Sequence, residues 1–124
     1  MMQNFRREGP RIDVEALCWE LVDGKETSGL AVDISPIGLR IERPYVPGPT
    51  RQTVPLQIEV PGIDEVMWAR AEACYDVLLP SKTYGIIRRT GYFIAGAAAR
   101  DLRMLEEYVV ETHRARRESY GYLT

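Results

Sequence analysis

Two short motifs near the N-terminus combine side chains that suit an anionic ligand with hydrogen-bonding edges. One is an RxxxR pair at residues 7–11, directly preceded by another arginine, and the other is DxSxxG at residues 33–38. A guanidinium group forms forked, charge-assisted hydrogen bonds to phosphates or to paired acceptors on a base. A carboxylate can accept hydrogen bonds from two neighbouring N–H groups at once. The candidate binding residues are therefore Arg6, Arg7, Arg11, Asp33, Ser35 and Gly38.

Other residue types that perform catalysis or bind metals are not placed to do so. The single histidine, His113, has no nucleophile or second ligand near it in a recognisable pattern. The segment 24–27 departs from a phosphate-binding loop, because Glu26 stands where that motif has Ser or Thr. Cys18 and Cys74 lie in apolar-patterned segments without metal-ligand spacing and are expected to act as small buried hydrophobes. We expect no catalytic residue, no metal site and no enzymatic activity.

Length, composition and charge indicate one ordinary globular domain. The chain has 124 residues, of which 45% are apolar and 27% charged. Its formal net charge of −2 argues against general binding to nucleic acid, which requires a broad positive surface. The longest run of apolar and small residues, 92–99, is far shorter than the roughly 20 residues of a membrane helix. No apolar run follows the basic N-terminal residues as in a secretory signal, so we expect a cytoplasmic protein.

A two-residue period predicts a mainly β chain. Residues 1–12 are polar and basic around Gly9-Pro10 and are expected to form a flexible arm that carries RxxxR, ahead of a single domain at 13–124. Pro55 interrupts the cleanest alternation and removes a hydrogen-bond donor, which predicts an edge or bulged strand there. Six short strands suggest a small antiparallel barrel. The predicted strands cover residues 14–21, 30–34, 37–41, 54–60, 67–75 and 84–98.

The C-terminal part of the chain has a helical period instead. Leu102, Leu105 and Val109 share one face and predict an amphipathic helix at about 100–117. Acidic residues give way to arginines toward its end, which suits the helix dipole. The apolar stripe must cover another surface, and we expect it to pack on the open mouth or the side of the barrel.

In this order, and on a small β-barrel with a C-terminal helix, the two motifs resemble those of the PilZ family, bacterial receptors for cyclic di-GMP. The resemblance covers essentially the whole chain, including the segments 38–41 and 89–93, and implies a six-stranded split barrel. There is one departure: similar proteins often have Gly-x-x-Phe where this sequence has Gly96 to Ala99. How the helix packs without that aromatic ring stays open, with Tyr92 or Phe93 as candidate substitutes.

The chemistry of the motif residues suits the ligand that the resemblance implies. Cyclic di-GMP is a dianion with two guanines, and Arg7 and Arg11 can clamp either its phosphates or the guanine O6 and N7 acceptors. Asp33 can accept both hydrogen bonds from guanine N1–H and N2–H, a donor pair that adenine does not present. Ser35 can bond to the base or fix the turn, and Gly38 leaves room for a ring or for the arm.

The resemblance implies a non-enzymatic receptor whose arm folds over cyclic di-GMP, with no other cofactor. Since the chain contains no second domain to regulate, we expect the signal to pass to a separate protein through the arm or the helix face. Motility, surface adhesion and polysaccharide export are the implied pathways. In similar proteins a basic residue at the position of Arg6 tends to accompany an intercalated pair of ligands, which predicts two ligands per chain.

Three alternatives remain at this point. On local chemistry alone, residues 33–38 can be a simple hairpin turn, and Arg7 and Arg11 a solubilising tail. A PilZ-like adaptor can bind a protein partner without any nucleotide, although the intact motifs argue against it. Binding of single-stranded nucleic acid on aromatic platforms ranks last, because Trp19, Trp68 and the tyrosines are dispersed.

Overall fold

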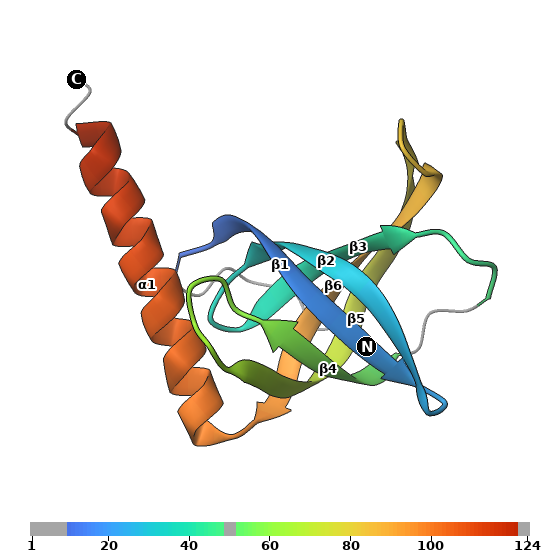
Figure 1. Cartoon of the computed structure of the whole chain (residues 1–124), viewed down its shortest axis with the longest axis horizontal. Helices are drawn as coiled ribbons and strands as arrows, with labels where there is room; N and C mark the ends of the chain where they lie inside the picture. Colours follow the sequence, from blue (N-terminus) through green and yellow to red (C-terminus); the bar gives the residue numbers. More distant parts are fainter. Residues whose placement is uncertain (1–9, 49–51, 122–124) are drawn as a thin grey trace.

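The computed structural model describes residues 10–48 and 52–121, with the side chains of the C-terminal helix described up to residue 119. Six antiparallel strands hydrogen-bond in the closed order β1-β2-β3-β6-β5-β4, and one helix follows them (Figure 1). The predicted antiparallel barrel with a C-terminal helix is confirmed. The elements are β1 (Ile12–Val22), β2 (Lys25–Ile34), β3 (Gly38–Pro44), β4 (Thr53–Glu59), β5 (Val66–Ser81), β6 (Gly85–Ala97) and α1 (Ala99–Gly121).

A two-residue turn joins β1 to β2. Asp23 and Gly24 both have positive φ, 51° and 75°, and Val22 pairs with Lys25 across the hairpin. Two left-handed residues in succession match the right-handed twist of the strands, and Asp-Gly is a preferred pair for such turns. This turn fixes the register along which β1 and β2 pair, with one irregularity near the start of β1.

Inward-facing residues at alternate strand positions form the core. In β4, Val54, Leu56 and Ile58 are buried, whereas Pro55 and Glu59 are exposed. Burying each such aliphatic side chain contributes roughly 1.5–3 kcal/mol relative to leaving it in water. The alternation predicted from the sequence therefore places the barrel interior correctly in this strand.

Cys18 lies in the same core and is fully buried. Burial raises the pKa of its thiol to about 12, so the group stays neutral. The expectation of a small buried hydrophobe is confirmed for this residue. Cys74 is partly buried, and burial raises its pKa as well.

The prediction of an edge strand around Pro55 is wrong, because barrel closure gives β4 a neighbour on each side. β4 pairs with β5 along its whole length, but with β1 at only three positions, which end at Leu56 opposite Glu20. Pairing to β1 thus stops just before Pro55, which has no N–H to donate. The proline marks the end of a short seam in the barrel.

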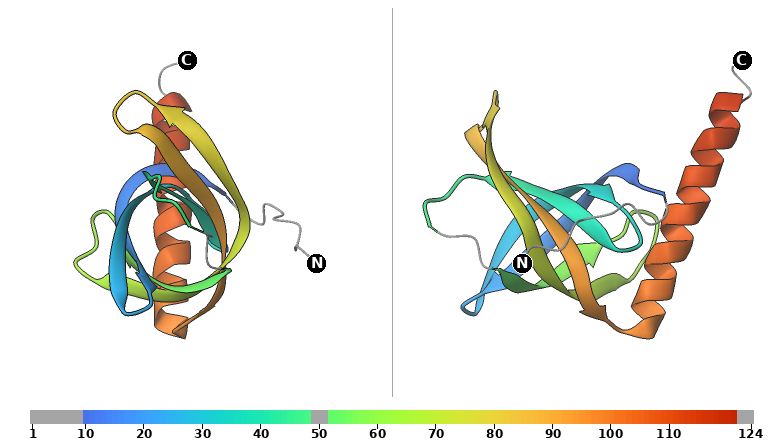
Figure 2. Two further views of the ribbon diagram at one scale, coloured as in Figure 1. Left: turned by 90° about the vertical axis from the view of Figure 1, so that its right-hand side faces the viewer. Right: turned by 180° about the vertical axis from the view of Figure 1, so that it is seen from behind.

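α1 leans across one end of the barrel, and its C-terminal half extends beyond the strands (Figures 1 and 2). It runs a few residues further than the predicted 100–117. Leu105 and Val109 are buried in the core, so the helix closes this end as its apolar stripe predicts. Phe93 lines a hollow beside the helix together with Leu102 and Val110, and it is therefore the ring that lies near the helix face.

Tyr92 lies inside the barrel instead, in a row of polar side chains that runs from the buried Glu20 to the exposed Asp76. Its hydroxyl donates to Glu20 Oε1 at 2.8 Å, and Arg43 Nη1 lies 3.2 Å from the same oxygen. Arg43 also donates to Thr90 Oγ1 at 3.1 Å, and Thr90 donates to Asp76 Oδ1 at 2.8 Å. Burial raises the pKa of Tyr92 above its ordinary value, which keeps the phenol a donor. The row crosses β1, β3, β5 and β6 and ties these strands together.

We predict that Arg43→Met lowers the free energy of unfolding by roughly 3 to 5 kcal/mol, because it leaves the Glu20 carboxylate buried without its cation. Both side chains are at most 10% exposed, so water cannot take the place of the guanidinium. Urea unfolding measures the change. Arg103→Met, at an exposed helix position, is the control and should change stability by less than about 0.5 kcal/mol. Equal effects of the two substitutions would contradict a structural role for this row of polar side chains.

Candidate functional site

The two sequence motifs meet at one end of β2. Arg11, just before β1, donates from Nη1 to Asp33 Oδ1 at 3.1 Å, although the two residues are 22 positions apart. Their side chains are 8% and 10% exposed. The β1–β2 register brings them together, since it sets Asp13 opposite Asp33. A carboxylate and a guanidinium group, both mostly removed from water, thus form the centre of the candidate site.

A second arginine completes the surroundings of Asp33, and no role was predicted for it from the sequence. Arg40 on β3 stands opposite Asp33 in the β2–β3 register, and its Nη1 lies 3.8 Å from Asp33 Oδ2. Its buried Nε has no hydrogen-bond partner among the described residues. The signal that could have identified it is the register across the tight turn at 35–38. Each oxygen of Asp33 therefore faces one guanidinium group.

The charge balance at Asp33 is unfavourable for the ionised form. Burial raises the pKa of the Asp33 carboxyl above its ordinary value, and the neighbouring Asp13 raises it further. The positive charges of Arg11 and Arg40 lower the pKa but do not offset the burial. Burial therefore disfavours the charged form of Asp33 in the folded protein, and carboxyl groups with shifted pKa values are common at binding and catalytic sites.

Ser35 and Gly38 form the turn between β2 and β3. Ser35 Oγ accepts hydrogen bonds from the backbone N–H groups of Ile37 and Gly38, at 3.3 and 3.1 Å. The Ser35 backbone N–H donates to Gly38 O at 2.8 Å. Of the two roles expected for the serine hydroxyl, the turn-fixing role is present in this structure. Gly38 is buried and pairs with Phe93 of β6.

Arg6 and Arg7 lie outside the described residues. Among the predicted site residues, the structure thus brings together Arg11, Asp33 and the turn formed by Ser35 and Gly38. This grouping is rich in donors and has one acceptor side chain. It can take a ligand that has negative charge and a pair of N–H donors.

A hollow of about 480 Å³ lies beside this polar group, between α1 and the end of the barrel. Pro10 at the start of the described chain and Pro36 and Ile37 of the turn line one side of it. Leu102 and Val110 of the helix line the other side. Its mostly apolar lining suits the faces of a planar ring whose edge reaches the polar side chains.

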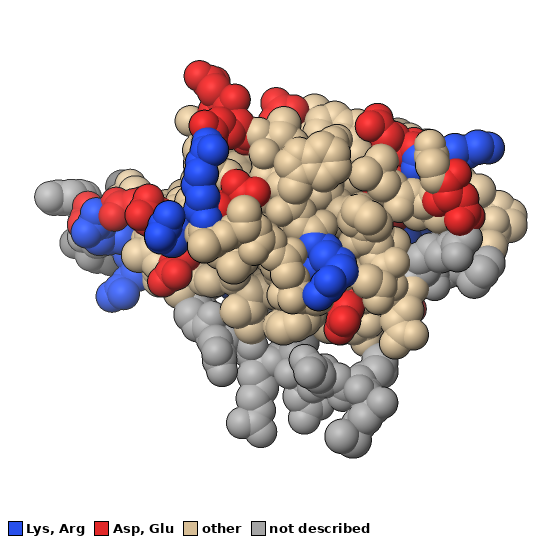
Figure 3. Space-filling view, turned by 90° about the horizontal axis from the view of Figure 1, so that it is seen from below, with Lys and Arg blue, Asp and Glu red and all other residues tan. Residues whose placement is uncertain are grey.

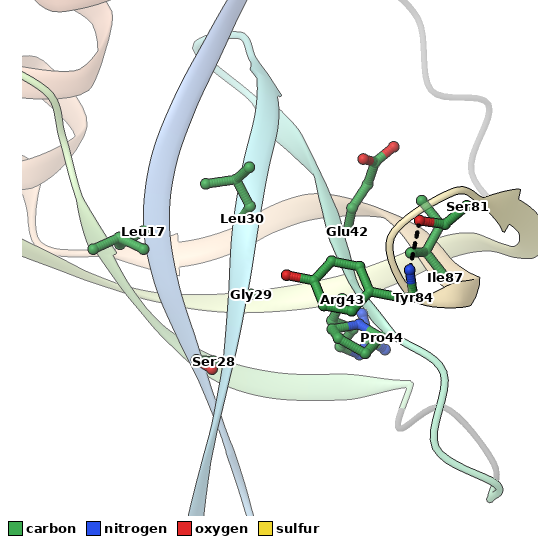
Figure 4. Close-up of a pocket in the computed structure, with 10 residues that line it drawn as sticks. All are labelled: Leu17, Ser28, Gly29, Leu30, Glu42, Arg43, Pro44, Ser81, Tyr84 and Ile87. Carbon is green, nitrogen blue, oxygen red and sulfur yellow. Dashed lines mark hydrogen bonds between the residues drawn. The ribbon is translucent and has the colours of Figure 1, made fainter.

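A second hollow, of about 440 Å³, contains no residue of either motif (Figure 4). It lies between the outer face of β1–β3 and the tip of the β5–β6 hairpin, where Tyr84 N donates to Ser81 Oγ at 3.2 Å. Leu17 and Leu30 line it from the barrel side. We do not assign the ligand to this hollow, because its lining offers no match for the two motifs.

The described part of the chain holds no group of three or more His, Cys, Asp or Glu placed to bind a metal ion. Within residues 10–48 and 52–121, no helix combines the length and apolar character needed to cross a membrane.

Comparison with known proteins identifies the fold. No family model matches the sequence, and no curated protein does. Among solved structures, the Bacillus subtilis inhibitor of motility MotI/DgrA superposes with a TM-score of 0.74 at 17% identity, over 90% of this chain and 53% of that one. A PilZ domain with c-di-GMP, from Escherichia coli YcgR, superposes with a TM-score of 0.67 at 18% identity, over 94% of this chain and 98% of that one. MrkH of K. pneumonia in its apo state superposes with a TM-score of 0.69 at 13% identity, over 91% of this chain and 55% of that one.

The resemblance to PilZ domains is therefore confirmed at the level of the fold. The chain spans about half the length of the MotI/DgrA and MrkH chains, and nearly all of the YcgR domain.

We predict that the free energy of unfolding of the wild type rises relative to that of Asp33→Asn as the pH falls. A carboxyl with a raised folded pKa binds more protons when folded, so it stabilises the wild type as pH falls and this contribution is lost as pH rises through the folded pKa. The wild type should therefore gain stability relative to the variant on acidification toward the ordinary pKa of 3.8. Urea unfolding at several pH values measures the difference between the two proteins.

Glu26→Gln, which removes an exposed carboxylate at the other end of β2, is the control. A stability difference between the wild type and Asp33→Asn that shrinks on acidification would contradict a raised pKa and would show that Asp33 is mainly a structural ion-pair residue.

Proposed function

We propose that this chain is a cytoplasmic, non-enzymatic receptor that binds cyclic di-GMP through its RxxxR and DxSxxG motifs. The observation that carries the proposal is the placement of the mostly buried Asp33 carboxylate between Arg11 and Arg40. The shared fold with a PilZ domain that holds c-di-GMP supports it. The apolar hollow next to the turn at 35–38 provides a surface for a purine face.

Binding requires an exchange of partners at Asp33. Guanine N1–H and N2–H would take the two carboxylate oxygens that now face Arg11 and Arg40. At least one guanidinium group would then leave the carboxylate and face a phosphate or the O6 and N7 edge of a guanine. Arg7 from the arm would add a further cation. Adenine fails at the first step, because it has no such donor pair.

The bound complex acts on a separate protein. Ordering of the arm over the ligand changes the surface next to α1, and a partner that prefers this surface shifts the equilibrium toward it. Regulation of motility or exopolysaccharide is the pathway we favour, in line with the names of the structural neighbours, such as the inhibitor of motility.

A PilZ-like adaptor without nucleotide is the second candidate. It is favoured by one observation: each oxygen of Asp33 faces an arginine of the chain itself, Oδ1 by a hydrogen bond from Arg11 and Oδ2 by an ion pair with Arg40 at 3.8 Å. In that case the polar group holds the start of β1 against the turn and nothing more.

We predict that isothermal titration gives a dissociation constant for cyclic di-GMP in the micromolar range or tighter, weakening with added salt because two or more cations face a dianion. GMP and cyclic di-AMP should bind far more weakly. Asp33→Ala should weaken binding roughly 5- to 150-fold and reduce the preference for guanine, since the base loses its acceptors. Glu26→Ala, at an exposed position at the other end of β2, should bind like the wild type.

The same titration gives the stoichiometry, for which the basic residue Arg6 predicts two ligands per chain. If no heat is released or absorbed at high micromolar cyclic di-GMP, the receptor hypothesis is refuted and the adaptor hypothesis remains. Wild-type binding by Asp33→Ala would reduce Asp33 to a turn residue.

A further inference from the structure

The only two tryptophans of the chain lie in one row on the outside of the barrel. Trp19 of β1 pairs with Gln57 of β4, and Gln57 pairs with Trp68 of β5. Neighbouring strands are about 4.8 Å apart, so the two tryptophan backbones are about 10 Å apart. The expectation that these residues are dispersed is wrong, because barrel closure brings β1 and β5 to either side of β4.

Apolar residues surround this row on the same outer face. Leu17, Val66 and Trp68 are 52%, 44% and 50% exposed, which is unusual for side chains of their size. We call this surface the tryptophan face. It comprises Leu17, Trp19, Leu21, Leu30, Pro55, Val66 and Trp68. Viewed from the β4 side, the barrel has a broad, largely uncharged area (Figure 3).

One border of the tryptophan face is acidic. Glu15, Glu59 and Asp64 line a hollow of about 350 Å³ that Leu17 also lines, and no lysine or arginine lines it. None of these three carboxylates has an ion pair within the described residues. On the opposite border Arg70 is the basic residue, facing Pro55 across β4 and β5. The face is thus an apolar centre with an acidic flank on one side.

We propose that the tryptophan face docks a protein segment whose centre is aromatic or aliphatic and whose flank carries Arg or Lys. Tryptophan is enriched among the residues that dominate binding energy at interfaces, and exposed apolar clusters of this kind mark interaction sites on soluble domains. The three carboxylates at the flank match cationic side chains. Trp68 and Leu17 fill the partner's apolar pockets, and Glu59 pairs with its flank.

Charge decides between this occupant and others. A single-stranded nucleic acid would place phosphates against the acidic border, which repels them. A second copy packed face to face through this same surface would offer one described arginine, Arg70, against three carboxylates. A partner segment with several basic residues matches all three.

This surface is separate from the nucleotide site. Leu30 is the residue of the tryptophan face that lies nearest to Asp33 along β2, three residues or about 10 Å away. Trp19 pairs with Ser28, which is five residues or about 17 Å from Asp33 along the strand. Docking on the tryptophan face therefore does not rest on nucleotide binding, and the two can fail independently.

Selection from a random library of 12-residue peptides on phage tests the proposal, with wild-type protein as bait and Leu17→Ser/Trp68→Ser for counter-selection. We expect enriched peptides with an aromatic or aliphatic centre and Arg or Lys on one side. An enriched peptide labelled with fluorescein should bind to Leu17→Ser/Trp68→Ser at least tenfold more weakly than to the wild type, as measured by fluorescence anisotropy. Glu59→Lys should weaken binding several-fold without altering the apolar centre.

Two controls separate this surface from others. Val77→Ser/Leu78→Ser removes comparably exposed apolar groups from the β5–β6 hairpin, outside the hollow that Leu17 and Leu30 line, and should bind the peptide like the wild type. Asp33→Ala should also bind it like the wild type, whatever its affinity for cyclic di-GMP. Melting curves establish that each variant is folded, and Glu59→Lys keeps the test decisive if the double variant is not.

Several outcomes would overturn the proposal. These are no enrichment over counter-selection, an acidic consensus, or equal peptide binding by wild type and Glu59→Lys. Saturable binding of oligo(dT) that Trp68→Ser abolishes would assign the face to nucleic acid. A wild-type dimer in sedimentation that Trp68→Ser converts to monomer would assign it to a second copy.

Discussion

The register between neighbouring strands determines the polar and apolar groupings of this chain. The pairing of β1, β2 and β3 places Arg11 and Arg40 on the two oxygens of Asp33. The β1–β4 pairing that closes the barrel, together with the β4–β5 register, sets Trp19 and Trp68 on either side of one β4 residue. One geometric constraint thus generates a charged site at one end of the barrel and an apolar face on its side.

Local periodicity was sufficient to predict where most strands lie, because side-chain alternation is a property of a single strand. The DxSxxG segment was also recognisable, since a serine, a glycine and a proline define a tight turn through their own backbone preferences. The helix could be predicted from three apolar residues at helical spacing. These features need no information about neighbours in space.

Register between strands could not be predicted in the same way. Glu20 reads as one polar residue in an apolar run, and its burial depends on Arg43 and Tyr92 from distant strands. Arg40 looked like an ordinary outward-facing residue until its position opposite Asp33 was known. Pro55 suggested an edge because an open sheet has edges, and closure removes them.

Burial disfavours the charged form of Asp33, and the carboxylate can accept two neighbouring N–H donors such as those of guanine. For these reasons we regard Asp33 as the residue on which the proposed function depends. A crystal structure of the chain with cyclic di-GMP tests this most directly. The account predicts a guanine whose N1 and N2 lie within hydrogen-bond distance of the Asp33 carboxylate, with Arg11 or Arg40 moved onto a phosphate or the O6 and N7 edge. A complex in which both arginines stay on Asp33 and no guanine reaches it would contradict the account.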